Sequence, residues 1–156
     1  MKTLDVNQFT NAPKQLQIQR FLNAPIHKVW EVVSDHQRMT SWMPMIKKVD
    51  LTKANSKGEW QEGCERQCQF GPDLLEEKIV HWDPPYGYAY TIADMHIVKN
   101  HLGYFKLIEK MEGTEVIWTQ YYHPNGNIIK KWMAKNIMLP SVMKKALKNL
   151  EKKTIV

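Results

Sequence analysis

Residues 129–150 read IKKWMAKNIMLPSVMKKALKNL, a stretch in which apolar side chains, together with one asparagine, recur every three or four positions. Lysines fill the positions between them, so the pattern predicts one long amphipathic helix of about seven turns. Proline inside a helix removes a backbone hydrogen bond and clashes with the preceding turn, so Pro140 predicts a kink near residues 136–140. The recurring positions, one of them a polar asparagine, are Ile129, Trp132, Met133, Asn136, Leu139, Met143, Ala146, Leu147 and Leu150.

The chain before this helix is rich in strand patterns. Residues 14–23 alternate between glutamine and apolar side chains, which is typical of a half-buried strand. Pro25, at the first helical position, and a cap at Ser34 or Asp35 predict two short helices that end near Trp42. Short turn-like connectors imply that the next strands are antiparallel neighbours. We expect those strands over residues 45–51, 60–70, 74–83, 86–94, 100–111 and 115–123.

This order of elements predicts an α+β fold in which one face of a curved antiparallel sheet of about seven strands is covered by the C-terminal helix. A curved sheet wrapped around a helix leaves an internal cavity, and concave apolar cavities bind small molecules. We expect one domain over residues 1–156, in which residues 1–13 form a loose N-terminal arm.

Composition excludes several classes of protein. Hydrophobic residues make up 43% of the 156 residues and charged residues 24%, which is typical of a folded globular chain. The sequence has no membrane-spanning apolar run and no signal-peptide pattern, so we expect a cytoplasmic protein. Cys64 and Cys68 are too far apart along one strand for a disulfide and are wrongly spaced for a zinc site. We expect no metal and no cofactor.

The positive charge is concentrated at the C-terminal end. Residues 126–156 contain eight lysines and one acid, Glu151, whereas residues 1–125 contain 14 basic and 15 acidic groups. Most simply, these lysines form a solvated helix face. The alternative is weak contact with an anionic membrane. Nucleic acid is not expected, because the sequence carries no recognised binding motif. The lysines that would contact a membrane are Lys130, Lys131, Lys135, Lys144, Lys145 and Lys148.

Several segments resemble the SRPBCC superfamily, whose fold is called the helix-grip. The superfamily includes START-type lipid carriers, birch-pollen-allergen proteins and bacterial polyketide cyclase/dehydrase-like proteins, to which residues 14–152 are most similar. The resemblance implies binding of a small hydrophobic or amphipathic molecule, lipid-like or polyketide-like, in the cavity. The matching segments are APIHKVWEVVSD (24–35), SWMPMI (41–46), GCER (63–66), EKIV (77–80), DPP (83–85) and YAYTI (88–92).

A charged pair is predicted inside the sheet. If Gly71 and Pro72 form a two-residue turn, Arg66 lies directly opposite Glu77, where an arginine can hold a carboxylate. That the pair faces the cavity is implied by the resemblance, since family members often carry an arginine and an acid there. Two interpretations stay open: a structural ion pair, or a polar anchor for a ligand carbonyl or carboxylate.

Strand alternation selects the other inner residues. A turn centred on Glu112 and Gly113 pairs Leu107 with Trp118 and Phe105 with Gln120, and it leaves the more polar alternate set facing solvent. Methionine and aromatic side chains suit a wall that adapts to an apolar ligand. The predicted ligand-binding residues are Trp42, Arg66, Phe70, Glu77, Tyr88, Tyr90, Ile92, Phe105, Leu107, Trp118, Gln120, Tyr122, Trp132, Met133, Asn136 and Met143.

Two other functions remain open. The first is a polyketide cyclase- or aromatase-like enzyme, for which the resemblance offers Arg66 as oxyanion stabiliser, Tyr90 as general acid and Glu77 as base. The ion pair with Arg66 argues against Glu77 as a base, so we favour a binding protein. The second is a protein-interaction or co-chaperone-like module. None of the six histidines has metal-ligand spacing, and each is expected on the surface or in a loop.

Overall fold

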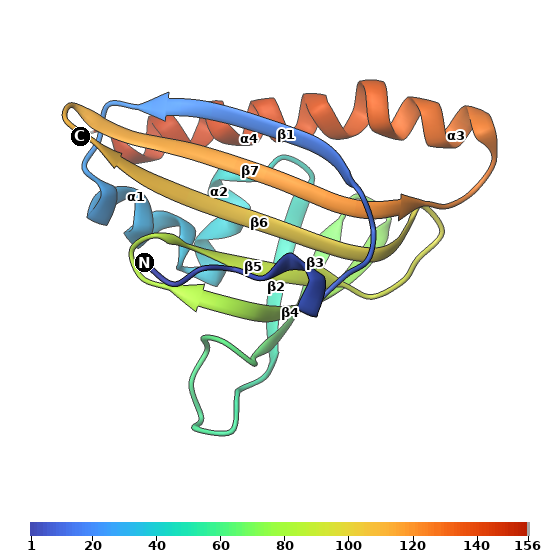
Figure 1. The fold of residues 1–156 in the computed structure, drawn as a ribbon, viewed down its shortest axis with the longest axis horizontal. Coiled ribbons are helices and arrows are strands. Elements are labelled where there is room, and N and C mark those ends of the chain that lie inside the picture. Colours follow the sequence, from blue (N-terminus) through green and yellow to red (C-terminus); the bar gives the residue numbers. More distant parts are fainter. Residues whose placement is uncertain (156) are drawn as a thin grey trace.

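The computed structural model describes residues 1–155, and its centre is one seven-stranded antiparallel sheet (Figure 1). The strands follow one another in space as β1-β7-β6-β5-β4-β3-β2, so the first strand closes onto the last. The sheet curves around the long C-terminal helix, which confirms the predicted helix-grip α+β fold. The strands are β1 (Lys14–Leu22), β2 (Ile46–Lys53), β3 (Glu65–Phe70), β4 (Asp73–Asp83), β5 (Gly87–Ile92), β6 (Val98–Lys110) and β7 (Gly113–Pro124).

Short helical segments connect β1 to β2, as predicted. Helix α1 (Ile26–Val33) buries four apolar side chains, and Pro25 is its N-cap, one position earlier than predicted. The Asp35 side chain accepts hydrogen bonds from the backbone N–H groups of the 3-10 helix η2 (His36–Arg38). The four-residue α2 (Met39–Trp42) follows directly. Together these segments cover one end of the space between sheet and long helix (Figure 1).

The long helix is divided in two by an irregular turn. It consists of α3 (Ile128–Met133), a π-helical turn (Ala134–Met138) and α4 (Leu139–Thr154). The predicted kink at residues 136–140 therefore takes the form of a π turn that ends just before Pro140. Helix α4 buries Met143, Ala146, Leu147 and Leu150 against the core. No helix within residues 1–155 is long and apolar enough to cross a bilayer.

Two details of the predicted sheet were wrong. Strand β3 begins at Glu65, because residues 54–64 form a loop instead of extending the strand back to Trp60. In the β6–β7 hairpin, Lys110 pairs with Gly113, so the turn residues are Met111 and Glu112. Phe105 therefore pairs with Trp118 and Leu107 with Val116, two positions away from the predicted partners. A shift of two residues leaves each side chain on its predicted face.

The N-terminal residues do not form the loose arm that we expected. The backbone N–H of Lys2 donates to Asp83 Oδ2 at 2.7 Å, and Thr10 Oγ1 donates to the carbonyl oxygen of Asn100 at 2.5 Å. Thr10 and Ala12 are buried. Hydrogen bonds to β4 and β6 thus hold this segment, which runs past β4 and β5 (Figure 1).

The buried stripe of α4 yields a stability prediction. Leu150 is fully buried and does not line the cavity described below, so Leu150→Ala should lower the free energy of unfolding by about 2–5 kcal/mol. Lys148→Ala on the exposed side of the same helix should change it by less than about 0.5 kcal/mol. Urea unfolding followed by tryptophan fluorescence measures both. Equal effects of the two substitutions would contradict this packing.

Candidate functional site

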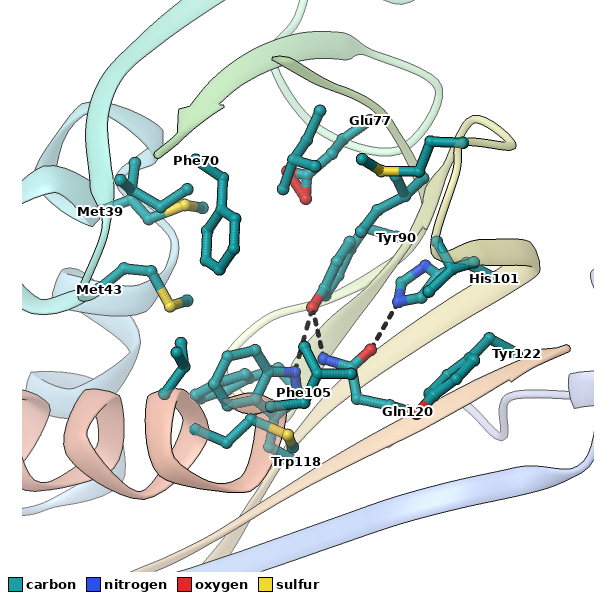
Figure 2. Close-up of a pocket in the computed structure, with 18 of the residues that line it drawn as sticks. Met39, Met43, Phe70, Glu77, Tyr90, His101, Phe105, Trp118, Gln120 and Tyr122 are labelled. Atoms are coloured by element: carbon teal, nitrogen blue, oxygen red, sulfur yellow. Dashed lines mark hydrogen bonds between the residues drawn. The ribbon is translucent and has the colours of Figure 1, made fainter. Parts of the chain in front are cut away.

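A cavity of about 100 Å³ lies between the concave face of the sheet, α2 and the start of α4 (Figure 2). Of the 21 residues that line it, all but Arg66, Glu77, His101 and Gln120 are apolar or aromatic. The predicted residues that do line it are Arg66, Phe70, Glu77, Tyr88, Tyr90, Ile92, Phe105, Trp118, Gln120, Tyr122 and Met143. They come from β3, β4, β5, β6, β7 and α4, so the curvature of the sheet brings them together.

The sequence analysis missed ten residues of the cavity wall. Half of them lie on segments whose place depends on tertiary packing: the α2–β2 connection, the β5–β6 loop and the first turn of α4. Strand alternation alone gives no signal for such positions. Strand alternation does predict Leu75, because it lies on β4 on the same face of the β3–β4 hairpin as Phe70. The missed residues are Met39, Met43, Ile46, Leu75, Met95, Ile97, Val98, His101, Leu139 and Val142.

Two predicted residues belong to the packed core behind the cavity. The Trp42 ring lies edge-on to Phe105, with ring centroids 5.8 Å apart, and is 1% exposed. Leu107 is also fully buried without lining the cavity. Both were predicted on the correct side of the structure but one layer too close to the cavity.

Three predicted residues of the long helix lie outside the cavity altogether. Trp132 is 59% exposed, Met133 is 50% exposed and Asn136 is also exposed. A π turn inserts one extra residue, which rotates the helix before it by about 100° relative to the helix after it. The stripe that continues through Met143 and Leu147 therefore does not extend back into α3, and the prediction for these three was wrong.

The polar end of the cavity is built on the predicted pair of Arg66 and Glu77. Their strands pair in the predicted register, and Arg66 Nε donates to Glu77 Oε2 at 3.3 Å. Arg66 is 1% exposed and Glu77 6%. Burial by itself would lower the pKa of Arg66, but the neighbouring carboxylate outweighs it and raises the pKa, so the guanidinium stays charged. The pair is thus a buried ion pair that reaches the cavity.

His36 completes the arginine site. Arg66 Nη1 donates to His36 Nδ1 at 2.8 Å, and because an arginine can only donate, Nδ1 must be unprotonated. The proton therefore sits on Nε2, which donates to the carbonyl oxygen of Trp60 at 2.8 Å. Burial, and next the charge of Arg66, lower the pKa of His36, which keeps the ring neutral. This chain of contacts ties the loop of residues 54–64 to the cavity.

Both cysteines, Cys64 and Cys68, are buried and free. Cys68 Sγ donates to Glu77 Oε2 at 3.0 Å. Burial, and next the Glu77 carboxylate, raise the pKa of Cys68, so the sulfur remains a protonated thiol. A protonated thiol is a poor nucleophile, and Cys68 acts as a hydrogen-bond donor to the carboxylate.

A second polar network surrounds the Tyr90 hydroxyl (Figure 2). Its oxygen accepts hydrogen bonds from Trp118 Nε1 at 3.1 Å and from Gln120 Nε2 at 3.2 Å, while Gln120 Oε1 accepts one from His101 Nε2. Burial, followed by the charge of Glu77, raises the pKa of Tyr90, so the hydroxyl keeps its proton. Because the hydroxyl oxygen already accepts two hydrogen bonds, the hydroxyl proton remains available for donation to a ligand oxygen.

Gly103 makes room for this tyrosine. A Cβ atom at Gly103 would lie 2.3 Å from Cζ and 2.6 Å from the hydroxyl oxygen of Tyr90. The Tyr90 ring packs directly on the backbone of β6 at Gly103. Any side chain at this position would push the ring out of its network.

The predicted placement of the histidines was wrong for half of them. His36, His81 and His101 are buried, and burial lowers the pKa of each, that of His101 to about 4. On β6, His101 is separated by an even number of positions from Phe105, which lines the cavity, so strand parity could have supplied the signal that it lies on the inner face. Within residues 1–155, no three histidine, cysteine or acidic side chains are grouped as metal ligands.

Comparison with known sequences relates the chain to one protein family. Residues 14–154 match the sequence model of the family described as polyketide cyclase / dehydrase and lipid transport. The chain belongs to this family. The resemblance to the SRPBCC superfamily is thereby confirmed. A search of curated proteins found no match.

Solved structures share the fold at low sequence identity. The protein XoxI from Bacillus cereus is 19% identical, with a TM-score of 0.72 over 89% of this chain and 94% of that chain. A START superfamily protein from Mycobacterium smegmatis is 11% identical, with a TM-score of 0.72 over 91% and 97%. The di-domain ARO/CYC BexL of the BE-7585A biosynthetic pathway is 14% identical, with a TM-score of 0.73 over 90% of this chain and 50% of that one. Identities this low show the fold alone.

The buried ion pair yields a second prediction. Arg66→Met leaves the Glu77 carboxylate buried without a positive partner and should lower the free energy of unfolding by about 3–5 kcal/mol. Arg66→Met with Glu77→Leu removes both charges and should recover most of this loss. Arg20→Met breaks the exposed Arg20–Glu151 pair and should cost only about 0–1 kcal/mol. Urea unfolding tests the set, and a double variant no better than Arg66→Met would contradict it.

The lowered pKa of His101 yields a third prediction. Below pH 6.5 the unfolded chain takes up a proton at this ring, whereas the native ring does so only near pH 4. Stability is therefore lost as the pH falls, by about 2–3 kcal/mol from this group between pH 7.5 and 4.5. His101→Gln should reduce that loss, and the exposed His27→Gln should leave it unchanged. A wild-type pH profile in His101→Gln would disprove the assignment.

Proposed function

We propose that the protein binds a small amphipathic molecule, apolar along most of its length and carrying one or more oxygen atoms, in the cavity between the sheet and α4. The observation that carries this proposal is the composition of the wall, which is apolar except for a few polar groups fixed at defined points. Burial of the apolar part would drive binding at roughly 25 cal/mol per Å². The family description, which includes lipid transport, supports the same class of ligand.

Polar groups in the wall define what the oxygen atoms of the ligand would meet. The Arg66 guanidinium and the Tyr90 hydroxyl can both donate to a carbonyl or carboxylate oxygen. Tyr122 also lines the cavity, and its hydroxyl is buried and has no hydrogen-bond partner within residues 1–155. A buried hydroxyl without a partner is costly, and a ligand oxygen would satisfy it.

The size of the cavity adds a condition. At about 100 Å³ it is smaller than the 300–1,000 Å³ typical of sites for small-molecule ligands, so binding requires that the wall move. Four methionines line it, and methionine side chains change shape at little cost. They are Met39 in α2, Met43 just after α2, Met95 in the β5–β6 loop and Met143 in α4. None of the four comes from the sheet.

Binding without turnover is the function that we favour for the polar residues. Glu77 already accepts hydrogen bonds from Arg66 and Cys68, so it is not placed as a free base for a ligand. His36 is likewise bonded on both ring nitrogens. These groups hold one another in place, which suits orientation of a ligand better than proton transfer.

The proposal predicts that filling the cavity abolishes ligand binding. Val142 lines the cavity and is half-buried, so Val142→Trp adds an indole ring to the cavity rim. Binding of the uncharged probe N-phenyl-1-naphthylamine, followed by its fluorescence, should weaken by roughly tenfold or more. Lys144→Trp, on the exposed face of the same helix, is the matched control and should bind the probe as the wild type does.

Two outcomes would contradict the proposal. The first is equal binding of the probe by the wild type and by Val142→Trp. The second is the recovery of only empty protein when the freshly purified chain is examined by native mass spectrometry and solvent extraction.

A further inference from the structure

The start of the long helix presents an apolar surface that is largely uncovered within residues 1–155. Helix α3 and the π turn contain no buried residue. Their exposed apolar side chains are Ile128 at 82%, Ile129 at 68%, Trp132 at 59%, Met133 at 50% and Ile137 at 49%. We call these five residues the α3 apolar face. In Figure 1 this end of the helix extends past the tip of β7.

This segment is amphipathic in its own right. At 3.6 residues per turn, the five apolar side chains fall within about one half of the helix circumference, and Lys130, Lys131 and Lys135 fall in the other half. No acidic residue occurs between positions 126 and 150. An apolar face that includes a tryptophan, bordered by lysines with no acidic residue in the segment, is the pattern of a helix that lies in the surface of an anionic bilayer.

Charge also argues against the alternative of a second copy of the chain. Two copies that met through this segment would bring two sets of three lysines together with no acid among them, and like charges repel. An anionic lipid surface instead attracts every lysine, and Trp132 suits the boundary between headgroups and acyl chains. The charge complementarity therefore favours a membrane.

The segment also adjoins one side of the cavity wall. Asn125, just before α3, bonds through its backbone N–H to the carbonyl oxygen of Ile97 at 3.1 Å and through Nδ2 to that of Met95 at 3.0 Å. Met95 and Ile97 line the cavity and are only half-buried, as are Leu139 and Val142 just after the π turn. A bilayer bound at α3 would thus lie next to half-buried residues of the cavity wall.

We propose that the α3 apolar face and the three lysines beside it form a docking surface for an anionic lipid bilayer. The apolar side chains enter the interfacial region while the lysines remain at the headgroups. Docking in this way needs no ligand in the cavity, so it stands or falls separately from the binding function proposed above.

Vesicle co-sedimentation tests the proposal directly. The full chain is mixed with vesicles of phosphatidylglycerol and phosphatidylcholine, or of phosphatidylcholine alone, and we expect binding to the anionic vesicles that decreases as salt is added. The triple variant K130E/K131E/K135E should bind them roughly tenfold or more weakly. The matched control K47E/K48E/K53E changes three exposed lysines of β2 by the same net charge and should bind much as the wild type does.

A second pair of variants tests the apolar contribution. W132S/M133S should also weaken binding by roughly tenfold or more, whereas M111S/I155S, which removes two exposed apolar side chains elsewhere, should not. All substituted side chains are exposed, and circular dichroism confirms that each variant is folded.

Three results would overturn the proposal. One is no preference of the wild type for anionic vesicles. Another is equal weakening by the β2 lysine variant and the α3 lysine variant, which would show a general effect of net charge. The last is a dimer of the free protein, seen by analytical ultracentrifugation, that W132S/M133S dissociates, because a second copy would then cover the face.

Discussion

The packing of α4 across the concave face of the sheet is the contact on which the rest of the structure depends. Its stripe from Met143 to Leu150 is buried and closes one half of that face. Because the π turn rotates the preceding helix, the stripe does not continue past Leu139, and the other half of the face stays partly hollow. The cavity and the exposed α3 are therefore two consequences of one irregularity in the helix.

A charge inside an apolar wall places a second constraint on the cavity. Desolvation of Arg66 costs several kcal/mol, and only a close carboxylate with further hydrogen bonds offsets it. Glu77 supplies the carboxylate and a neutral His36 supplies an acceptor, while Cys68 donates to the same carboxylate. The ion pair therefore organises side chains from β3, β4 and η2, together with one loop, around a fixed positive charge, which a ligand would meet already oriented.

The sequence predicts which face a strand residue occupies more reliably than which partner it has. The turn at Gly71 places Arg66 opposite Glu77 correctly, because glycine and proline mark that turn clearly. At the β6–β7 hairpin the partner of Phe105 was wrong by two positions, yet the residue still faces the core, because side chains alternate with period two. Pro140 predicts a kink in the helix but not a π turn with its extra residue, which depends on how the helix packs, and so Trp132 was misplaced.

The small volume of the cavity and the identity of its walls together explain how such a site can accept a ligand. The walls from the sheet are stiff, because aromatic rings from β5, β6 and β7 stack on one another, as Tyr88 does on Phe105. The helical and loop segments of the wall carry the methionines, whose side chains change shape at little cost. Expansion is therefore directed away from the sheet, toward the start of α4 and the β5–β6 loop. The fixed polar groups keep their positions while the apolar wall adapts, so orientation of the ligand and tolerance of its shape reside in different parts of the fold.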